Sequence, residues 1–254
     1  MRNFVFITLF PEMICQAAGY SILGRAAKEG LLAVHCVNPR DYATDRHRSV
    51  DDSTCGGGAG MVLKPQTYLA ALQRARELAP DALVAAMTPV GEAVHQDRIC
   101  ALADSGKDII FLCGHYEGFD ERILAQADLR LSVGDFVLTG GELPALAIMD
   151  AVARFIPGVL GKLVSAEEDS FRDSLLEYPQ YTRPVEYEGQ PVPEVLLSGD
   201  HGKIARWRRK EALRATLQHR PELLRSMKWQ KGDGKLFLAI QEERREQNKN
   251  KEKC

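Results

Sequence analysis

The chain has 254 residues, 45% of them hydrophobic, and a formal net charge of −2, a composition typical of a folded soluble protein with a sizeable core. The longest apolar run, residues 143–160, contains Asp150, Arg154 and Pro157, and the apolar N-terminus leads into a proline, so neither a membrane span nor a secretion signal is expected. The six cysteines form no CxxC pair, which argues against a zinc site and a disulfide framework. We expect a cytoplasmic protein with reduced thiols and no membrane association.

Charge is divided unevenly along the chain. From His201 onward there are 16 Lys and Arg against 7 Asp and Glu, whereas residues 1–200 hold 17 against 28. A basic region attached to an acidic body indicates a polyanionic partner, although basic termini are often only solvated. Charge alone leaves both interpretations open.

The first 155 residues alternate between short apolar runs and stretches with helical spacing. The apolar runs predict strands at residues 3–10, 31–38, 81–87, 108–114 and 129–138. The spacing between them predicts helices within residues 11–30, 95–106, 120–126 and 142–155. Strands that alternate with helices are typical of an α/β fold with a mainly parallel sheet and helices on both faces.

Three predicted loops follow strands: Thr88–Glu92, Cys113–Gly118 and Thr139–Pro144. Because the carboxyl ends of parallel strands share one edge, all three would lie where such sheets bind ligands. Any one glycine in this region would be an ordinary turn residue, but several together would let the loops bring their backbones against one flat ligand. Val133 and Leu138 would then cover the faces of that ligand. The glycines are Gly91, Gly114, Gly134, Gly140 and Gly141.

The common nucleotide-binding signatures are absent from the sequence. The stretch Cys55–Met61 does not satisfy GxGxxG, and no GxxxxGK[ST] occurs, so neither a Rossmann dehydrogenase nor a P-loop enzyme is expected. The glycine-rich run Gly56–Gly60 is either a flexible surface loop or a loop that moves over a ligand.

The pattern changes after Pro157. Up to about residue 202 the chain is rich in proline and has no clear period, which is typical of a linker or an irregular segment. Helical spacing then returns, so we expect a small, mainly helical C-terminal domain with a frayed charged tail, and Trp207 on an apolar helix face. The opposite face would be either a phosphate-binding stripe or merely a solvated surface. Its basic residues are Lys203, Arg206, Lys210 and Arg214.

In order and spacing, up to about residue 230, the chain resembles the bacterial tRNA (guanine-N1-)-methyltransferase family through the motifs VNPRDY, VDDSTCGGGAGM, CGHYEGFDERI, VGDFVLTGGELPA, DAVARFIPGVLG, SAEEDSF, YPQYTRP and WRRK. That family belongs to the SPOUT class, so the resemblance implies a deep trefoil knot and a homodimer built around the cofactor sites. Periodicity alone would have excluded a knot. The predicted organisation is a catalytic domain of residues 1–160, a flexible linker of residues 161–175 and a tRNA-binding domain of residues 176–254.

The resemblance implies S-adenosylmethionine as cofactor, bound among the knot loops, where glycines would clear space for adenosine. It also implies magnesium, with Glu117 as a candidate carboxylate, but we assign no metal ligand. The predicted cofactor-binding residues are Thr88, Pro89, Gly91, Gly114, Tyr116, Glu117, Val133, Gly134, Asp135, Phe136, Val137, Leu138, Gly140, Gly141 and Pro144.

Two catalytic residues also follow from the resemblance. Guanine N1 carries a proton that a base must remove, and the motif match assigns this role to Asp169 and the stabilisation of charge on O6 to Arg154. By residue type alone, Asp169 would rather be a helix N-terminal or solvated charge, and Arg154 an ion-pair partner. His115 stands where many relatives have arginine. The implied substrate is the guanosine just 3′ of the tRNA anticodon, in a single-stranded loop.

Two other functions remain open from the sequence. A related SPOUT enzyme could methylate a ribose hydroxyl or a different RNA, and mapping of the methylated nucleoside would distinguish the two. A non-catalytic RNA-binding module would bind no cofactor, and the glycine-containing loops would then have no role.

Overall fold

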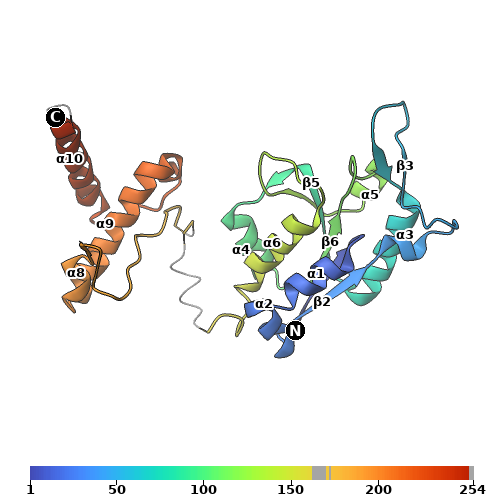
Figure 1. Cartoon of the computed structure of the whole chain (residues 1–254), viewed down its shortest axis with the longest axis horizontal. Coiled ribbons are helices and arrows are strands. Elements are labelled where there is room, and N and C mark those ends of the chain that lie inside the picture. Colours follow the sequence, from blue (N-terminus) through green and yellow to red (C-terminus); the bar gives the residue numbers. More distant parts are fainter. Residues whose placement is uncertain (162–169, 172, 252–254) are drawn as a thin grey trace. The chain divides into compact units, whose positions relative to one another are not determined.

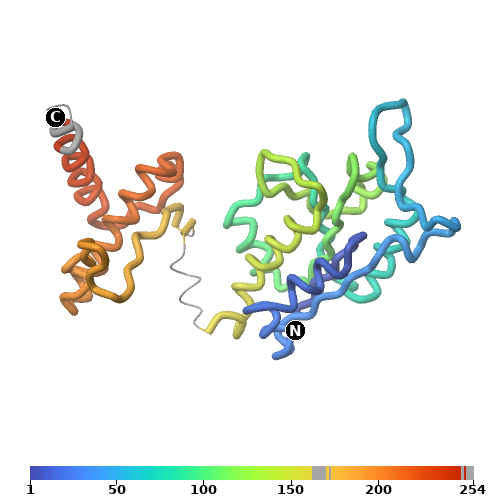
Figure 2. The backbone as a smooth tube through the Cα atoms, in the orientation of Figure 1, coloured from blue at the N-terminus to red at the C-terminus, as the bar shows by residue number. Residues whose placement is uncertain are grey.

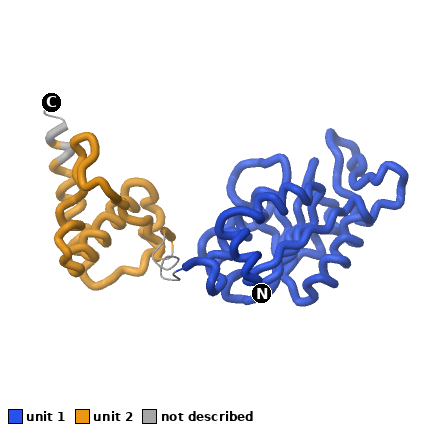
Figure 3. Tube along the Cα trace, turned by 60° about the horizontal axis from the view of Figure 1, so that its bottom comes forward, with its two compact units in different colours: residues 1–166 blue, residues 167–254 orange. Residues whose placement is uncertain are grey.

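The computed structural model describes residues 1–161, 170–171 and 173–251. The chain divides into two units, residues 1–166 and residues 167–254, which Figure 3 shows in different colours. Unit 1 contains a five-stranded sheet, and unit 2 contains two long helices. Among the described residues, no helix is both long and apolar enough to cross a membrane.

The sheet of unit 1 is parallel throughout. Its strands, in their order across the sheet, are β2 (Leu32–Val37), β1 (Arg2–Ile7), β6 (Ile109–Cys113), β5 (Leu83–Ala93) and β7 (Leu129–Ser132). Each neighbouring pair of strands is parallel, and the central strand β6 is buried along its whole length. A parallel strand that is covered on both faces has this uniform burial. The predicted α/β class with a mainly parallel sheet is confirmed.

Helices cover both faces of the sheet (Figure 1). One face packs against α1 (Pro11–Ala18), α2 (Ser21–Lys28), α4 (Gln96–Asp104) and α6 (Glu142–Ala153). The other face packs against α3 (Pro65–Leu78) and α5 (Glu121–Leu124). Side chains of β1 point alternately to the two faces of the sheet. Phe4 and Phe6 pack in the hydrophobic core on the α1, α2, α4 and α6 face, and Val5 and Ile7 in the core on the α3 and α5 face.

α3 is an element that the sequence analysis did not predict. Two signals for it were present. Pro65 occupies the first turn, where proline is well tolerated, and Tyr68, Ala71, Leu72 and Ala75 follow at helical spacing. All four side chains are buried against the sheet, so α3 provides most of the cover on its face.

The predicted loop Thr88–Glu92 is wrong, because β5 continues through it. β5 pairs with β7 up to Met87, bulges away, and pairs with Leu131 again at Glu92. Gly91 lies against β7 within the bulge, since a Cβ there would be 2.5 Å from the backbone nitrogen of Leu131. A bulge of this kind re-aims side chains at the end of a strand.

The predicted strand at residues 129–138 is too long, because β7 ends at Ser132. Gly134 has a φ of +150°, which favours glycine and interrupts an extended strand. The apolar side chains that follow are exposed, Phe136 by 57% and Val137 by 82%. These residues therefore form an irregular loop rather than a buried strand.

Unit 2 is built around α9 (His201–His219) and α10 (Asp233–Lys251). Its small core includes Leu213 from α9 and Ile240 from α10. α10 extends as far as Lys251 into the charged tail for which we predicted fraying, because Glu, Arg, Gln and Lys are good helix formers, and the last three residues of that tail lie outside the described residues. The shorter elements of unit 2 are β8 (Glu186–Tyr187), β9 (Gln190–Pro191), α8 (Glu194–Leu197) and the 3-10 helix η2 (Pro221–Arg225).

Ion pairs join α9 to α10 and change the predicted basic stripe. Lys210 and Arg214 both bind Glu243 of α10, with N···O distances of 2.5 and 2.6 Å. Their charges are paired inside the unit, so these two residues are less available to a polyanion than the sequence alone indicates, and the choice between a phosphate-binding stripe and a solvated face stays open. Lys203 and Arg206 remain exposed on the same helix.

Candidate active site

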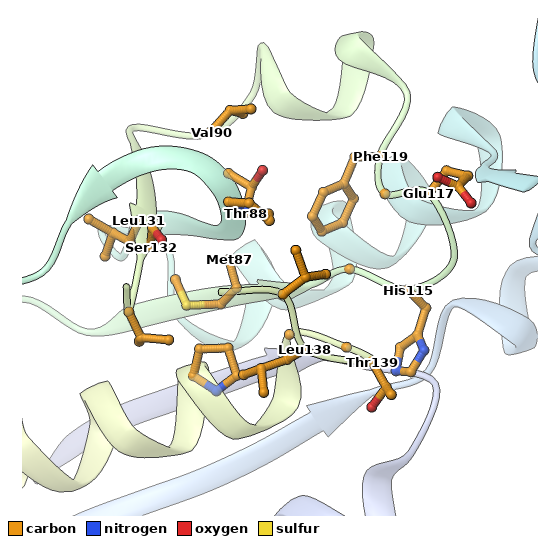
Figure 4. A pocket seen from close by; sticks show the side chains of 18 of the residues that line it. Met87, Thr88, Val90, His115, Glu117, Phe119, Leu131, Ser132, Leu138 and Thr139 are labelled. Atoms are coloured by element: carbon orange, nitrogen blue, oxygen red, sulfur yellow. The ribbon is translucent and has the colours of Figure 1, made fainter. Parts of the chain in front are cut away.

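A cavity of about 410 Å³ opens at the carboxyl ends of β5, β6 and β7 (Figure 4). Three segments supply most of its wall: residues 87–90 in the bulge of β5, residues 114–119 after β6, and residues within 131–141 after β7. Figure 4 shows the side chains of Met87, Phe119 and Leu138 around this space. A cavity of this size, with apolar side chains and nearby backbone polar groups, suits a small-molecule ligand.

Most of the predicted cofactor-binding residues lie in this wall. Three of them, Gly91, Gly134 and Asp135, do not. The predicted residues that line the cavity are Thr88, Pro89, Gly114, Tyr116, Glu117, Val133, Phe136, Val137, Leu138, Gly140, Gly141 and Pro144.

Other residues that were not predicted to bind the cofactor also line the cavity. Each of them except Leu124 lies within two positions of a predicted one, so proximity in sequence was the available signal for the rest. The set comprises Met87, Val90, His115, Gly118, Phe119, Leu124, Leu131, Ser132 and Thr139.

Two adjacent glycines let the chain pass close under the cavity. The N–H of Gly141 donates to the carbonyl of Gly114 at 2.9 Å, and a Cβ on Gly141 would lie 2.8 Å from the Cα of Cys113. A Cβ on Gly140 would lie 2.2 Å from Nε2 of His115. Such contacts leave no room for a side chain. Glycine is therefore required at position 141 by the packing of the backbone on itself, whether or not a ligand is bound, whereas at position 140 a side chain would have to displace the side chains of His115 and Glu142.

A buried carboxylate joins three elements beneath the cavity. Glu142, at the start of α6 and only 3% exposed, lies with Oε2 2.9 Å from Nε2 of His115. Its Oε1 accepts a hydrogen bond of 2.7 Å from the hydroxyl of Thr8, just after β1. The ring of Phe10 packs on His115 with 4.9 Å between ring centroids. The hydrogen bond needs a proton on one partner, either on Nε2 of His115 or on the carboxyl group.

Two further polar groups near the cavity, the Cys113 thiol and the Tyr68 phenol, take no part in acid–base chemistry near neutral pH. Burial raises the pKa of the Cys113 thiol and of the Tyr68 phenol well above their ordinary values. The Tyr68 hydroxyl also donates to the carbonyl of Cys113 at 2.8 Å, which satisfies it. Neither group ionises near neutral pH, so neither acts as a nucleophile or a base.

The glycine-rich hairpin is attached to the cavity loop. It consists of β3 (Asp51–Ser53) and β4 (Met61–Leu63), with Gly56–Gly60 between them, and it projects from unit 1 (Figure 2). The N–H of Glu117, a cavity residue, donates to the carbonyl of Met61 at 3.0 Å. The base of the hairpin is thus held beside the cavity wall.

Comparison with known proteins identifies the family. The model for tRNA (guanine-1)-methyltransferase TrmD matches residues 1–226. The chain belongs to this tRNA (guanine-1)-methyltransferase family. Membership makes it a methyltransferase, as the sequence resemblance predicted.

Curated relatives named tRNA (guanine-N(1)-)-methyltransferase match nearly full length. The protein from Desulforudis audaxviator (strain MP104C) is 49% identical over 235 residues, covering 92% of this chain and 94% of the relative. The protein from Syntrophomonas wolfei subsp. wolfei is 52% identical over 218 residues, covering 86% and 88%. The protein from Desulfitobacterium hafniense (strain Y51) is 51% identical over 241 residues, covering 94% and 90%.

Of the two predicted catalytic residues of this methyltransferase, only Arg154 lies in the described part of the chain, and it is not among the residues that line the cavity. Arg154 directly follows α6, whereas Pro144 lines the cavity near the start of α6. At about 1.5 Å of rise per residue, the two are roughly 15 Å apart along the helix axis. Asp169 lies outside the described residues. Both catalytic roles therefore stay predictions.

Proposed function

We propose that this methyltransferase transfers a methyl group from S-adenosylmethionine to N1 of the guanosine just 3′ of the tRNA anticodon. The observation that carries the proposal is the cavity at the carboxyl ends of β5, β6 and β7, whose wall is formed largely by positions that match the family's cofactor residues. Unit 2, which contains the basic excess from His201 onward, would bind the tRNA backbone.

The cavity fits S-adenosylmethionine in chemical character. Val133, Leu138 and Pro144 offer apolar contacts for the faces of a base, and the backbone of the loop after β6 offers hydrogen-bonding groups for its edge. Glu117 gives the wall a carboxylate, which suits a ligand that carries positive charge. When bound, S-adenosylmethionine supplies an activated methyl group on a sulfonium.

The protein's own part in the reaction is proton removal, charge stabilisation and alignment. Guanine N1 is nucleophilic only when its proton is taken, and Asp169 would accept that proton. The departing proton leaves charge on O6, which the guanidinium of Arg154 would stabilise. The loops around the cavity would align the two reactants and exclude water.

Magnesium enters the proposal only as a requirement that the family resemblance implies. Glu117 is the carboxylate in the cavity wall. Among the described residues, no group of three or more His, Cys, Asp or Glu side chains could hold a metal ion. We therefore assign magnesium no ligand and no step.

We further propose that the active enzyme is a homodimer whose sites are shared between chains. The position of Arg154, roughly 15 Å along α6 from Pro144, supports this, because the cavity of one chain would need that residue from elsewhere. Exposed apolar side chains at the starts of α1 and α6 offer a surface for a second copy: Phe10 by 47%, Met13 by 40% and Leu143 by 52%.

The trefoil knot also belongs to the proposal. In a SPOUT knot a later segment of chain passes through a loop formed earlier. The close passage of Gly141 beside Cys113 and Gly114, and the bond from Thr8 to Glu142, support such threading. Limited proteolysis within residues 133–141, followed by unfolding, would test whether opening this loop releases α6.

The function is tested by titrating S-adenosylmethionine into the protein and then incubating labelled cofactor with an unmodified tRNA that bears guanosine 3′ of the anticodon. We expect saturable binding and labelled N1-methylguanosine. Asp169→Ala should abolish transfer while leaving cofactor affinity nearly unchanged, and Asp173→Ala, a nearby exposed carboxylate, should retain transfer. Full activity of Asp169→Ala would overturn the assignment of the base.

Division of the site is tested by mixing two inactive chains, Arg154→Ala and Asp169→Ala, in one dimer. If the residues of one site come from different chains, the mixed dimer regains one intact site and transfers methyl groups. If both residues act from the same chain, the mixed dimer stays inactive.

A further inference from the structure

Unit 2 contains a second hollow, of about 530 Å³, which we call the Tyr181 groove. It lies between the segment Tyr178–Arg183 and the helices α8 and α9. Tyr178, Tyr181, Arg183 and Arg208 are the groove residues that matter for recognition. The groove is separate from the methyl-transfer cavity, which lies in unit 1.

The aromatic side chains of the groove form a supported platform. Trp207, half-buried on α9, packs with its ring centroid 6.5 Å from Tyr178 and 6.3 Å from Tyr181. Tyr178 is also half-buried, but Tyr181 is 49% exposed. A tyrosine that packs on a tryptophan and keeps about half of its surface exposed can stack against a planar ligand.

The groove carries positive charge, on Arg183 and Arg208, that can bind an anionic ligand. The guanidinium of Arg208 lies 4.9 Å above the ring of Tyr178, and Arg183 is exposed on the facing segment. Within the described parts of the chain, no ion pair involves Arg183 or Arg208, and the groove lining includes no carboxylate. This differs from Lys210 and Arg214 on α9, whose charges are taken up by Glu243.

Planar stacking surfaces combined with unpaired arginines match the chemistry of an unpaired nucleotide. Single-stranded bases stack on aromatic rings and on guanidinium planes, while arginine binds the phosphates. An aromatic groove can also bind a proline-rich peptide, but recognition of such a peptide requires neither two unpaired arginines nor a groove that lacks Asp and Glu side chains. Charge complementarity therefore favours RNA.

We infer that the Tyr181 groove binds an unpaired nucleotide of the tRNA, with its base stacked on Tyr181 and the adjoining phosphates at Arg183 and Arg208. The inference rests on the proposed function for its choice of RNA. It adds a nucleotide subsite, remote in sequence from the methyl-transfer cavity, by which the enzyme would recognise a base that it does not modify.

Trp207 packs on two tyrosines of the groove and can report on its occupancy, because it is one of only two tryptophans. Trp229→Phe, in the full-length protein, leaves Trp207 as the single tryptophan beside Tyr178 and Tyr181. Titration with unmodified tRNA should then change the Trp207 emission as the groove fills. The dissociation constant would be measured in parallel by fluorescence anisotropy of labelled tRNA, at several salt concentrations.

Four variants test the contacts separately. Tyr181→Ala should weaken tRNA binding about 5- to 100-fold, the loss expected when one stacked base loses its platform, whereas Tyr181→Phe keeps the ring and should bind like wild type. Arg183→Ala should lower the slope of log K against log salt by about 0.7–1. Tyr187→Ala is the matched control, since Tyr187 is 65% exposed in the same unit and lies outside the groove lining.

Equal affinities for Tyr181→Ala and Tyr187→Ala, with unchanged circular dichroism, would overturn the inference, and so would a Tyr181→Phe variant as weak as Tyr181→Ala. Labelled methyl transfer by the wild type is scored separately. If wild type transfers methyl but Tyr181→Ala binds normally, only the groove assignment fails. If binding depends on Tyr181 but no N1-methylguanosine forms, the groove assignment stands and the proposed function fails.

Discussion

The imidazole of His115 lies 2.9 Å from the carboxylate of Glu142, so the loop after β6 is bonded to the first residue of α6. His115 lines the cavity, whereas Glu142 lies behind it and is buried. The same carboxylate accepts from Thr8, which is fully buried after β1. One side chain thereby fixes three chain segments around the site, and its removal should affect stability and ligand binding together.

Glu142→Ala is expected to lower the free energy of unfolding by about 1–3 kcal/mol, because the buried Thr8 hydroxyl would lose its acceptor and His115 its hydrogen-bond partner. It should also weaken S-adenosylmethionine binding. Urea unfolding and calorimetric titration measure the two effects. Glu29→Ala is the control, since its pair with Arg25 is exposed and should contribute at most about 1 kcal/mol. Equal stability of the two variants would contradict the proposed role of Glu142.

The strand pattern of unit 1 could be predicted from the sequence because strands buried on both faces, such as Ile109–Cys113, consist of uninterrupted apolar residues. The same criterion failed at residues 133–138, where Phe136 and Val137 are apolar but line an open cavity. Sequence periodicity cannot tell an apolar side chain that faces a core from one that faces a ligand site.

Contacts between distant residues were also beyond sequence reasoning. The pairing of Lys210 and Arg214 with Glu243 depends on how α9 packs on α10, and no local sequence pattern predicts it. Family resemblance supplied the cavity residues that share a motif. It did not supply the bond between Thr8 and Glu142, which joins residues 134 positions apart.

Gly141→Ala is expected to disrupt the cavity. Its Cβ would lie 2.8 Å from backbone atoms of Cys113 and Gly114, which cannot move as a flexible side chain could. Overpacking of this kind costs about 1–3 kcal/mol and displaces the loop, so both thermal stability and cofactor affinity should fall. Gly161→Ala is the matched control, because a Cβ there meets no atom of the described residues within 4 Å. An unaltered melting temperature in Gly141→Ala would show that the loop relaxes freely.

Cys36 is expected to resist alkylation in the folded protein. Burial, together with the neighbouring Cys15 thiol and the Glu12 carboxylate, raises the pKa of Cys36 to about 12. A raised pKa means that the reactive thiolate is scarce at pH 8, about 1 in 10⁴ molecules. Mass spectrometry after iodoacetamide treatment should find Cys15 and Cys55, both exposed, modified well before Cys36. In urea the difference should disappear, and equal rates in the native state would refute the prediction.

Asp233 should make the stability of unit 2 sensitive to acid. Burial alone would raise its pKa, but hydrogen bonds from Arg209 and from the N–H of Gln230 outweigh burial and hold the pKa below its usual 3.8. A carboxylate with a depressed folded pKa stabilises the fold fully above the unfolded value, and that contribution is lost as pH falls through the folded value.

Asp233→Asn should therefore cost about 3 kcal/mol at pH 7, where it breaks a buried pair, and progressively less below about pH 3.8. Urea unfolding followed through Trp229, which packs on Phe237 in the same unit, measures this difference at each pH. Glu222→Gln, which removes an exposed and solvent-screened partner of Arg220, should change the curve far less than Asp233→Asn does. A pH-independent gap between wild type and Asp233→Asn would rule out Asp233 as the titrating group.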